Sequence, residues 1–507
     1  MALNAQVATP RASLTITGAQ RVGTGARIPA AIQGHTRRAF GSVARTRTLV
    51  VVARATIVAA ACLGATRGVH ARTVAGNPGM HSHVCGQYGG AQQRNADDLL
   101  GSMCGIRPNL ARHGISLGLT ESSEILGNTS GGTRRGFVYD GVTTATLQLD
   151  TQQAFGWSGG TFEISALQIH GNNLSARDLQ SLQTASGIES DRGTRLWELW
   201  YDQRLSSGGM LDLRVGQQSL DQEWMVSQNA LDFVNTMFGW AMLPSADLPA
   251  GGPAYPLSAI GARVRVHPHG PWTVLAGIYN GSPTNNAPGD PQRNDRHGTS
   301  FPLKGGVLAM LEAQYAVPAS VAQSPASVYR IGAWYDSEHF ADQEFDNTGQ
   351  SLANPASDGI AREHRGDWSV YGVVDQRLWT SSATPCRTLN YFLRPMWTPL
   401  AGRNPIDFSL NAGLTVTAPL PNRSNDTFGA AIAYAHVGSR LEALDRQQGY
   451  PVHAGETVVE WTYIDQVTPW FQLQPDVQYV FDPGAGVTTT QRLDNETVLG
   501  FRANISF

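Results

Sequence analysis

Hydrophobic and polar residues alternate along much of this chain, and the pattern is clearest at its C-terminus. In the last ten residues, VLGFRANISF, the apolar side chains of Leu499, Phe501, Ala503, Ile505 and Phe507 alternate with polar or small residues. A period of two over this length indicates a β-strand with one apolar and one polar face. Because the apolar face reaches the final residue, we expect this strand to be fixed by pairing rather than frayed.

Similar alternating segments follow Gly114 and are separated by clusters of Gly, Pro, Asn and Asp. Sixteen strands are predicted, at 114–126, 137–152, 160–172, 194–204, 210–217, 258–267, 271–280, 305–316, 327–336, 367–378, 388–397, 406–416, 426–435, 456–464, 468–481 and 496–507. Their connections alternate between a long set, averaging about 21 residues, and a short set, averaging about 7, as in outer-membrane barrels. The predicted fold is all-β: a transmembrane antiparallel β-barrel of about 16 strands, with long extracellular loops and short periplasmic turns.

Closure of the barrel explains why the alternating pattern of the C-terminal strand continues to the last residue. Lipid cannot form hydrogen bonds with bare backbone groups, so a sheet within a membrane must close on itself. The last strand, 496–507, is therefore expected to pair with the first, near 114–126.

Composition narrows the class of protein further. The 507 residues include 55 glycines, 15% are charged, and the net charge is −3, which favours neither a nucleic-acid binder nor a disordered chain. The mean hydropathy of −0.22 excludes a bundle of transmembrane helices, whereas alternating strands average to such a value. Lys304 is the only lysine, so the other basic side chains counted among the 37 Lys and Arg residues are all arginines.

The N-terminal region has the features of a targeting sequence. Several arginines precede the apolar run LVVVARATIVAAACLGA. A small-residue cleavage site follows at Val69-His70-Ala71, with Thr73-Val74-Ala75 as a second candidate. We expect residues 1–71 to be the signal segment, 72–113 a periplasmic segment with a short helix, and 114–507 the barrel. A buried helix of a soluble domain is the alternative interpretation of the apolar run.

Export would place Cys85 and Cys104 in an oxidising compartment, where a disulfide between them is the expected state. Cys386 is left single and is assigned no role. The stretch 81–85 contains metal-ligand residue types but lacks a clear fourth ligand. No metal site and no cofactor are therefore predicted.

Four blocks of sequence are more specific. They are LLGSMCGIRPNLARHGI, LWELWYDQRLSSGGMLDLRVGQQSLDQEW, VVEWTYIDQVTPWFQLQPDVQYVFDPG and the terminal VLGFRANISF. In order and spacing they resemble carbohydrate-selective outer-membrane porins of the OprB family, over roughly residues 100–507. One departure is the stretch 101–105, which reads Gly-Ser-Met-Cys-Gly where the family usually has a Gly-Asp-Trp-Gly-Gly-like turn. That change removes an acidic and an aromatic residue from the entrance region.

The resemblance implies a sixteen-stranded monomer or weak homo-oligomer in the bacterial outer membrane. Such a pore would pass sugars such as glucose passively into the periplasm. Its partners would be sugar permeants, outer-membrane lipid and the barrel assembly machinery.

A pore of this width needs an inward-folded segment to be selective. The longest predicted connection, 218–257, is the candidate, and its portion SLDQEWMVSQNALDFVNTMFGW is predicted to include a short helix. Asp221, Glu223 and Trp224 would then lie near the passage. Alternatively, this segment caps the outer rim.

A neutral sugar requires hydrogen-bonding partners for its hydroxyls and a flat apolar surface for its C–H face. Candidates on lumen-facing positions of the strands are Glu198, Trp200, Asp202, Asp212, Arg214, Arg330, Trp334 and Glu460. The alternative is that these charges form a salt-bridge network that stiffens the wall. The strand positions that alternate with lumen-facing ones should face lipid. The aromatic residues expected there are Trp197, Tyr201, Trp272, Trp461 and Tyr479.

The function that the sequence favours is a passive sugar-selective porin. The alternative is a barrel that serves polysaccharide export or interacts with an envelope complex. An enzyme is not predicted, because no spaced Ser/His/acid motif is present.

Overall fold

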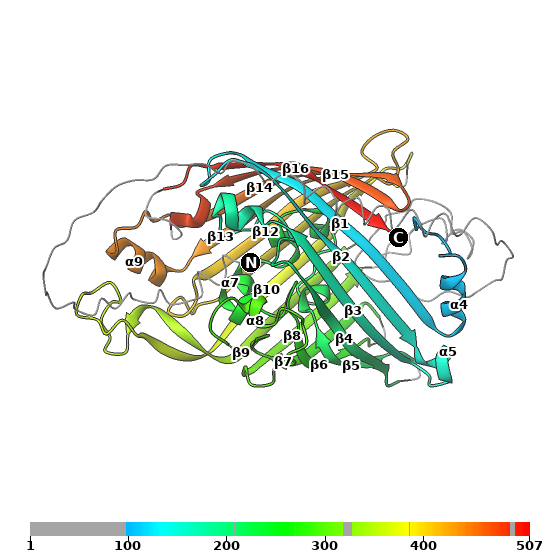
Figure 1. Ribbon diagram of the computed structural model, residues 1–507, viewed down its shortest axis with the longest axis horizontal. Coiled ribbons are helices and arrows are strands. Elements are labelled where there is room, and N and C mark those ends of the chain that lie inside the picture. Colours follow the sequence, from blue (N-terminus) through cyan, green and yellow to red (C-terminus); the bar gives the residue numbers. More distant parts are fainter. Residues whose placement is uncertain are drawn as a thin grey trace, which may run out of the picture.

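Sixteen antiparallel strands close into one barrel, in which each strand pairs with its neighbours in sequence and β1 pairs with β16 (Figure 1). The computed structural model describes residues 98–507 except 207, 269, 285, 318–326, 385 and 487–491. The predicted signal segment 1–71, the stretch 81–85 and Cys85 lie outside the described residues. Within them, no helix has both the length and the apolar composition needed to cross a bilayer.

Each observed strand overlaps one predicted strand, so the predicted sixteen-stranded barrel is confirmed. The strands are β1 Ile115–Ser130, β2 Gly136–Asp150, β3 Gly160–Gly171, β4 Gly193–Arg204, β5 Leu211–Gln218, β6 Ala259–Val266, β7 Trp272–Asn280, β8 Val307–Val317, β9 Ser327–Asp346, β10 Ala361–Thr380, β11 Thr388–Trp397, β12 Ile406–Thr417, β13 Thr427–Val437, β14 Gly455–Thr468, β15 Phe471–Phe481 and β16 Glu496–Ser506. The short helices are α4 Ile106–Arg112, α5 Thr151–Phe155, η1 Ser175–Leu179, η2 Leu220–Gln222, η3 Ala230–Asp232, α6 Thr236–Gly239, α7 Met242–Asp247, η4 Pro249–Gly251, α8 Pro291–Asn294, α9 Ser439–Gln447 and η5 Pro483–Gly486.

The C-terminal strand closes the ring, as expected from its sequence. β16 pairs with β1 from Thr120 opposite Ser506 to Ser130 opposite Thr497. The final residue is also held, because the backbone N–H of Phe507 donates to the carbonyl of Leu119 at 2.9 Å. In Figure 1 the arrowhead of β16 ends beside β1, near α4.

The connections are divided between the two rims. One rim carries 131–135, 172–192, 219–258, 281–306, 347–360, 398–405, 438–454 and, of the last connection, 482–486 and 492–495. The other carries 151–159, 205–210, 267–271, 381–387, 418–426 and 469–470, together with both ends of the barrel sequence. The predicted separation of long loops from short turns is therefore confirmed.

The β9–β10 hairpin is longer than predicted. The sequence 337–366 is rich in Asp, Gly and Asn and was expected to be a loop, but strand pairing continues to Asp346 opposite Ala361. Contacts from α9 stabilise this extension: Arg440 donates to Glu344 at 2.8 Å, and Gln447 donates to the same carboxylate at 3.2 Å. These tertiary contacts, between residues far apart in sequence, override the local loop propensity.

A β-bulge reverses the expected orientation of one aromatic residue. The register between β3 and β4 shifts between Ser165 and Ala166, opposite Glu198 and Leu196. Trp197 lies at this bulge and packs against the inward-folded Tyr255, with ring centroids 6.2 Å apart. The expectation that Trp197 faces lipid is therefore wrong, because one extra residue moves a side chain to the other face of the sheet.

The other four expected lipid-facing aromatics lie on the outward face. Trp272 and Trp461 are 50% and 42% exposed, and Trp272 packs against Tyr315. Tyr201 lies opposite the exposed Val215, and Tyr479 packs against the exposed Phe481.

Candidate functional site

The connection 219–258 folds into the barrel. It contains η2, η3, α6, α7 and η4, and most of its apolar side chains are buried in one cluster with residues of the inner wall. The wall residues of that cluster come from strands between β6 and β15. We call 219–258 the inner loop. In Figure 1 the green segment that carries α7 lies within the outline of the barrel.

Small residues on β13 make room for the inner loop. The inward positions of this strand are Gly429, Ala431, Ala433 and Ala435, and the three alanines are 6%, 0% and 0% exposed. A Cβ added to Gly429 would lie 2.7 Å from the ring of Phe233, so only glycine permits this approach. The inner loop therefore packs directly against the backbone of β13.

Carboxylates of the wall accept hydrogen bonds from backbone N–H groups of the inner loop. Glu460 accepts from Val234 at 2.6 Å and from Asn235 at 3.0 Å. Glu198 accepts from the N–H of Ser219 at 3.1 Å. A buried segment with little regular structure leaves such groups without partners, and unpaired buried N–H groups are costly. These two predicted lumen residues therefore anchor the loop.

Two further acids, Glu312 and Asp375, act in the same way. Glu312 accepts from the N–H of Met225 at 2.9 Å. Asp375 accepts from the N–H groups of Gln228 and Asn229 at 3.1 and 3.3 Å. Arg330, a predicted sugar contact, lies behind them and donates to Asp375 at 3.0 Å. Arg330 therefore supports the Asp375 carboxylate that anchors the loop, and it does not face solute.

Arg394 on β11 holds the carbonyl side of the same loop. Its guanidinium, fully buried, donates to the carbonyl oxygens of Met225, Met237, Phe238 and Gly239 at 2.6–3.0 Å. It also donates to the side chain of Asn411. A single side chain therefore joins two distant parts of the inner loop to the wall.

The predicted aromatic surfaces for a sugar are covered in this structure. Trp334 and Trp224 are 2% and 1% exposed within the cluster under the inner loop, and Trp224 donates to the hydroxyl of Tyr279 at 3.0 Å. Trp200 is also buried, with the guanidinium of Arg214 3.9 Å from its ring centroid. The expectation that these rings face the passage is corrected, because the loop and an arginine occupy their faces.

Asp221 closes the base of the inner loop instead of facing the passage. It accepts from the hydroxyl of Ser219 at 2.6 Å and from the N–H of Tyr255 at 3.0 Å, which joins the two ends of the loop.

Asp247, in helix α7 of the inner loop, contacts the wall directly. Its carboxylate accepts from the N–H of Ile406 at 3.3 Å. Burial raises the pKa of the Asp247 carboxyl well above its usual range, with Asp367 contributing in the same direction.

A second connection, 172–192, also enters the barrel and pairs with the inner loop. The N–H of Gly187 donates to the carbonyl of Val234 at 2.9 Å, and the N–H of Thr236 donates to the carbonyl of Thr184 at 3.2 Å. Glu456 on β14 accepts from the N–H of Gln183 at 2.7 Å. Two loops thus form one packed body inside the barrel.

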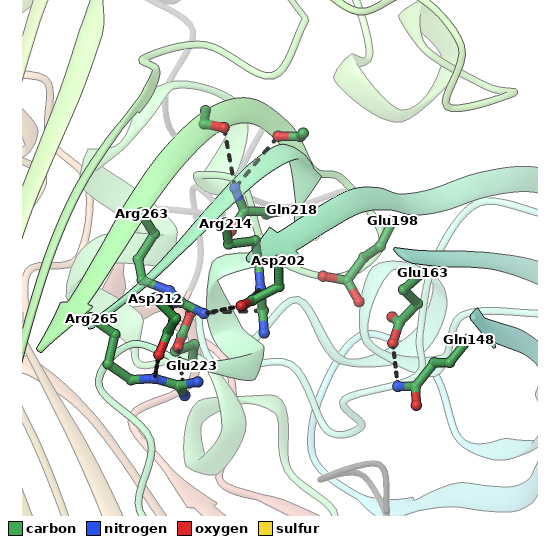
Figure 2. Close-up of polar contacts among 12 residues, drawn as sticks. Gln148, Glu163, Glu198, Asp202, Asp212, Arg214, Gln218, Glu223, Arg263 and Arg265 are labelled. Atoms are coloured by element: carbon green, nitrogen blue, oxygen red, sulfur yellow. Dashed lines mark hydrogen bonds and ion pairs between the residues drawn. The ribbon is translucent and has the colours of Figure 1, made fainter. Parts of the chain in front are cut away.

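Charged side chains gather where η2 meets β4, β5 and β6 (Figure 2). Three arginines and three carboxylates make up this group, which we call the ion cluster: Asp202, Asp212, Arg214, Glu223, Arg263 and Arg265. Figure 2 shows that Glu163, Glu198 and Gln148 continue the polar wall beside it.

Arg263 is the centre of the ion cluster. It donates to Glu223 at 2.9 Å and to Asp202 at 3.1 Å, and it also contacts Asp212. Arg263 is fully buried, and Arg265 beside it donates to Asp212 at 2.9 Å. Both arginines were missed, although the sequence IGARVRV places them on the face opposite to Ile260, Ala262, Val264 and Val266.

The outer members of the ion cluster remain partly exposed. Arg265 is 33% exposed, Arg214 is 18% exposed, and Glu223 and Asp202 are 16% and 13% exposed. Arg214 donates to Asp202 at 3.1 Å, and its second nitrogen lies 3.8 Å from Glu223. Of the predicted site residues, the structure thus brings Asp202, Asp212, Arg214 and Glu223 together at one place.

The predicted disulfide falls only partly within the described residues. Cys104 is disulfide-bonded, while Cys85 lies outside them, so this pairing stays a prediction. Cys386 is also disulfide-bonded, which corrects the expectation that it is left single.

Comparisons with known proteins agree with this architecture. The sequence profile of the family described as "Carbohydrate-selective porin, OprB family" matches residues 134–507. Porin B of Pseudomonas aeruginosa is 24% identical over 446 residues, which cover 82% of this chain and 92% of that protein. The putative porin QuiX of Acinetobacter baylyi is 23% identical over 448 residues, covering 81% and 93% of the two chains.

Among solved structures, the fold is similar to the high-pH structure of Pseudomonas putida OprB. The TM-score is 0.72 at 22% identity, and the match covers 81% of this chain and 99% of that one. The low-pH structure of the same protein matches with a TM-score of 0.51 at 18% identity, over 81% and 98% of the two chains.

Proposed function

The chain belongs to the OprB family of carbohydrate-selective porins, which are outer-membrane β-barrel channels and not enzymes, and from this membership we propose that it passes small neutral sugars such as glucose. Transport would be passive diffusion into the periplasm along the part of the lumen that the inner loop leaves open. The long-loop rim would face outward and the short-turn rim the periplasm.

The ion cluster is the observation that supports this proposal most. Its partly exposed members, among them Arg214, Glu223 and Arg265, offer hydrogen-bond donors and acceptors side by side. Guanidinium groups donate to sugar hydroxyls, and carboxylates accept from them. Several weak contacts of this kind suit conduction, since a tight site would not release its permeant.

The balance of charge in the cluster favours an uncharged permeant. Three arginines face three carboxylates, so the six charges of the cluster leave no net charge that would attract an anion or a cation. An anion-selective pore would be expected to present arginines without nearby acids.

The packed interior also supports a small permeant over a polymer. Connections 172–192 and 219–258 both enter the barrel and are joined to its wall by buried hydrogen bonds. A polysaccharide export channel, the alternative considered from the sequence, would require these anchored segments to leave the lumen.

Liposome swelling tests the proposal. Proteoliposomes carrying the wild-type chain should swell faster in glucose than in a zwitterionic amino acid of similar size. Empty liposomes are the control for leakage. Equal rates for the two solutes would contradict carbohydrate selectivity, and uptake limited to polymers would favour the export alternative.

A further inference from the structure

One short connection on the long-loop rim carries more arginine than its carboxylates can pair with. The connection 131–135 joins β1 to β2 and contains the adjacent Arg134 and Arg135, and Arg177 belongs to η1 in the neighbouring connection 172–192. We call these three residues the arginine cradle. A single buried carboxylate, that of Asp178, pairs with two of them, so the cradle keeps an excess of positive charge.

Backbone contacts fix the cradle in place. The N–H groups of Thr133 and Arg134 both donate to the carbonyl of Asp178, at 2.9 and 3.1 Å. This close approach requires Gly132, which has a left-handed φ of 62° and where an added Cβ would lie 2.7 Å from the same carbonyl oxygen. The connection between β1 and β2 is therefore held against η1 without a ligand.

The guanidinium groups of the cradle point their outer ends away from Asp178. Arg134 and Arg177 each donate from Nε to the same Oδ1 atom of Asp178, at 2.8 and 3.0 Å, and their side chains are 56% and 39% exposed. An added Cβ on Gly136 would lie 3.9 Å from Nη2 of Arg177, so this guanidinium lies close to the residue that follows Arg135. In the described part of the chain, neither the terminal Nη atoms of Arg134 and Arg177 nor the exposed Arg135 has a hydrogen-bond partner. The cradle thus offers several N–H donors to an anion from outside the chain.

The other acids of this part of the rim do not pair with the cradle. Glu496 is fully buried beside Gly132, and Asp494 reaches the connection through its backbone carbonyl, which accepts from the N–H of Gly132 at 3.4 Å. Among the described residues, neither acid forms an ion pair with the three arginines. By contrast, Arg440 elsewhere on the rim has the carboxylate of Glu344 at 2.8 Å.

The cradle lies where the lipid-facing surface of the barrel ends. Phe137, two residues after Arg135, is 58% exposed, and its ring lies over Gly127 of β1. Ile125, two residues before Gly127, and its partner Phe501 are 40% and 41% exposed on the same outward face. In the orientation given under the proposed function, the long-loop rim faces the outside. The cradle is then at the depth of the headgroups of the outer leaflet.

The chemistry of the cradle matches a phosphorylated headgroup. We propose that the arginine cradle binds a phosphate group of the glycolipid that forms the outer leaflet of the bacterial outer membrane. Guanidinium groups bind phosphate oxygens through pairs of N–H donors, and basic side chains at a membrane surface recognise anionic headgroups. The acyl chains of the same lipid would lie along the outward face at Phe137 and Ile125. This site is separate from the ion cluster, which lies on β4–β6 and η2.

Binding to a defined glycolipid in detergent tests the site. The cradle variant replaces all three arginines with glutamine: Arg134→Gln, Arg135→Gln and Arg177→Gln. The control variant replaces three exposed arginines elsewhere on the rim: Arg362→Gln, Arg365→Gln and Arg446→Gln. The cradle variant should bind diphosphorylated lipid A at least tenfold more weakly than the wild type, and the control variant should bind it as the wild type does. Equal binding by the two variants would refute the site.

Two further ligands identify the group that is recognised. The wild type should bind diphosphorylated lipid A at least tenfold more tightly than the dephosphorylated lipid, and the cradle variant should lose this preference. No preference in the wild type would overturn the proposal. Inorganic phosphate that binds as tightly as the lipid would also overturn it, because the site would then serve a free anion.

Folding and transport are checked separately. Heat-modifiable migration and the rate of liposome swelling in glucose should be the same in both variants as in the wild type, because the cradle lies outside the ion cluster and the inner loop. Loss of lipid binding with unchanged swelling separates this site from the proposed sugar selectivity. A failure of the lipid to bind leaves that selectivity untouched.

Discussion

Two sides of the lumen wall use charged residues differently. On β4–β6, Arg214 and Arg265 stay partly exposed and pair with carboxylates on neighbouring elements. On β11, Arg394 is fully buried and donates to four carbonyls of the inner loop. The first arrangement leaves charged groups partly exposed, while the second uses charge to fix the inner loop inside the barrel. Residue type alone does not separate these roles, and exposure does.

The difference extends to the residues around each arginine. β13, which also contacts the inner loop, presents alanine and glycine inward, so the loop can approach its backbone. β4–β6 present long charged side chains, which fill the space between η2 and the wall. The pore is therefore asymmetric, with a packed side near β11–β14 and a polar side near β4–β6.

The largest effect is expected from Arg394→Met. This change leaves buried carbonyls of the inner loop unpaired, and hydrogen bonds to a charged group are worth about 1.5–3 kcal/mol each. We expect the inner loop to detach, so single-channel conductance should rise and discrimination between glucose and amino acids should fall. Arg362→Met, an exposed position on β10, is the control. Unchanged conductance in Arg394→Met would show that Arg394 does not hold the loop.

A smaller effect is expected from Asp375→Asn. The carboxylate accepts from Ser227, Gln228, Asn229 and Arg330, and an amide would turn one acceptor oxygen into a donor. Leaving a buried donor unsatisfied costs about 1–3 kcal/mol, so the inner loop should become more sensitive to protease while the barrel stays folded. Asp358→Asn, at the exposed tip of the β9–β10 hairpin, should have no such effect. Equal protease sensitivity of the two variants would argue against anchoring by Asp375.

The smallest effect is expected on the polar side, where single charges are partly exposed. Arg265→Gln should shift the zero-current potential in a salt gradient towards cation selectivity, and Glu223→Gln should shift it towards anion selectivity. Each variant removes one charge from a balanced set of six, and partly exposed ion pairs contribute only about 0–1 kcal/mol, so the fold should be retained. Shifts of the same sign in both variants would contradict the balance of charge.

The sequence predicts the strands well because alternation is a local property. Residue parity alone places Asp202 and Arg214 on the lumen face, where the structure brings them together. The same parity fails at Trp197, because a β-bulge inserts one residue that no local pattern announces. It fails for the β9–β10 extension because α9, roughly 100 residues away in the chain, stabilises that hairpin.

The candidate site was predicted less completely because its contacts are long-range. Trp334 and Glu460 lie on the inner side of the wall, but the inner loop that covers them comes from 219–258, far from both in sequence. Two signals in the sequence could have revealed more. Arg263 and Arg265 alternate with apolar residues on β6, and small residues recur at every second position of β13 from Gly429 onward.

Cysteine accessibility in a planar bilayer tests the asymmetry of the pore most directly. Arg265→Cys replaces a partly exposed residue of the ion cluster, and Ala433→Cys replaces a fully buried residue of β13 under the inner loop. A water-soluble methanethiosulfonate reagent should reduce the current through Arg265→Cys channels and leave Ala433→Cys and wild-type channels unchanged. Equal loss of current at both positions would contradict a loop packed against β13 and a passage along β4–β6.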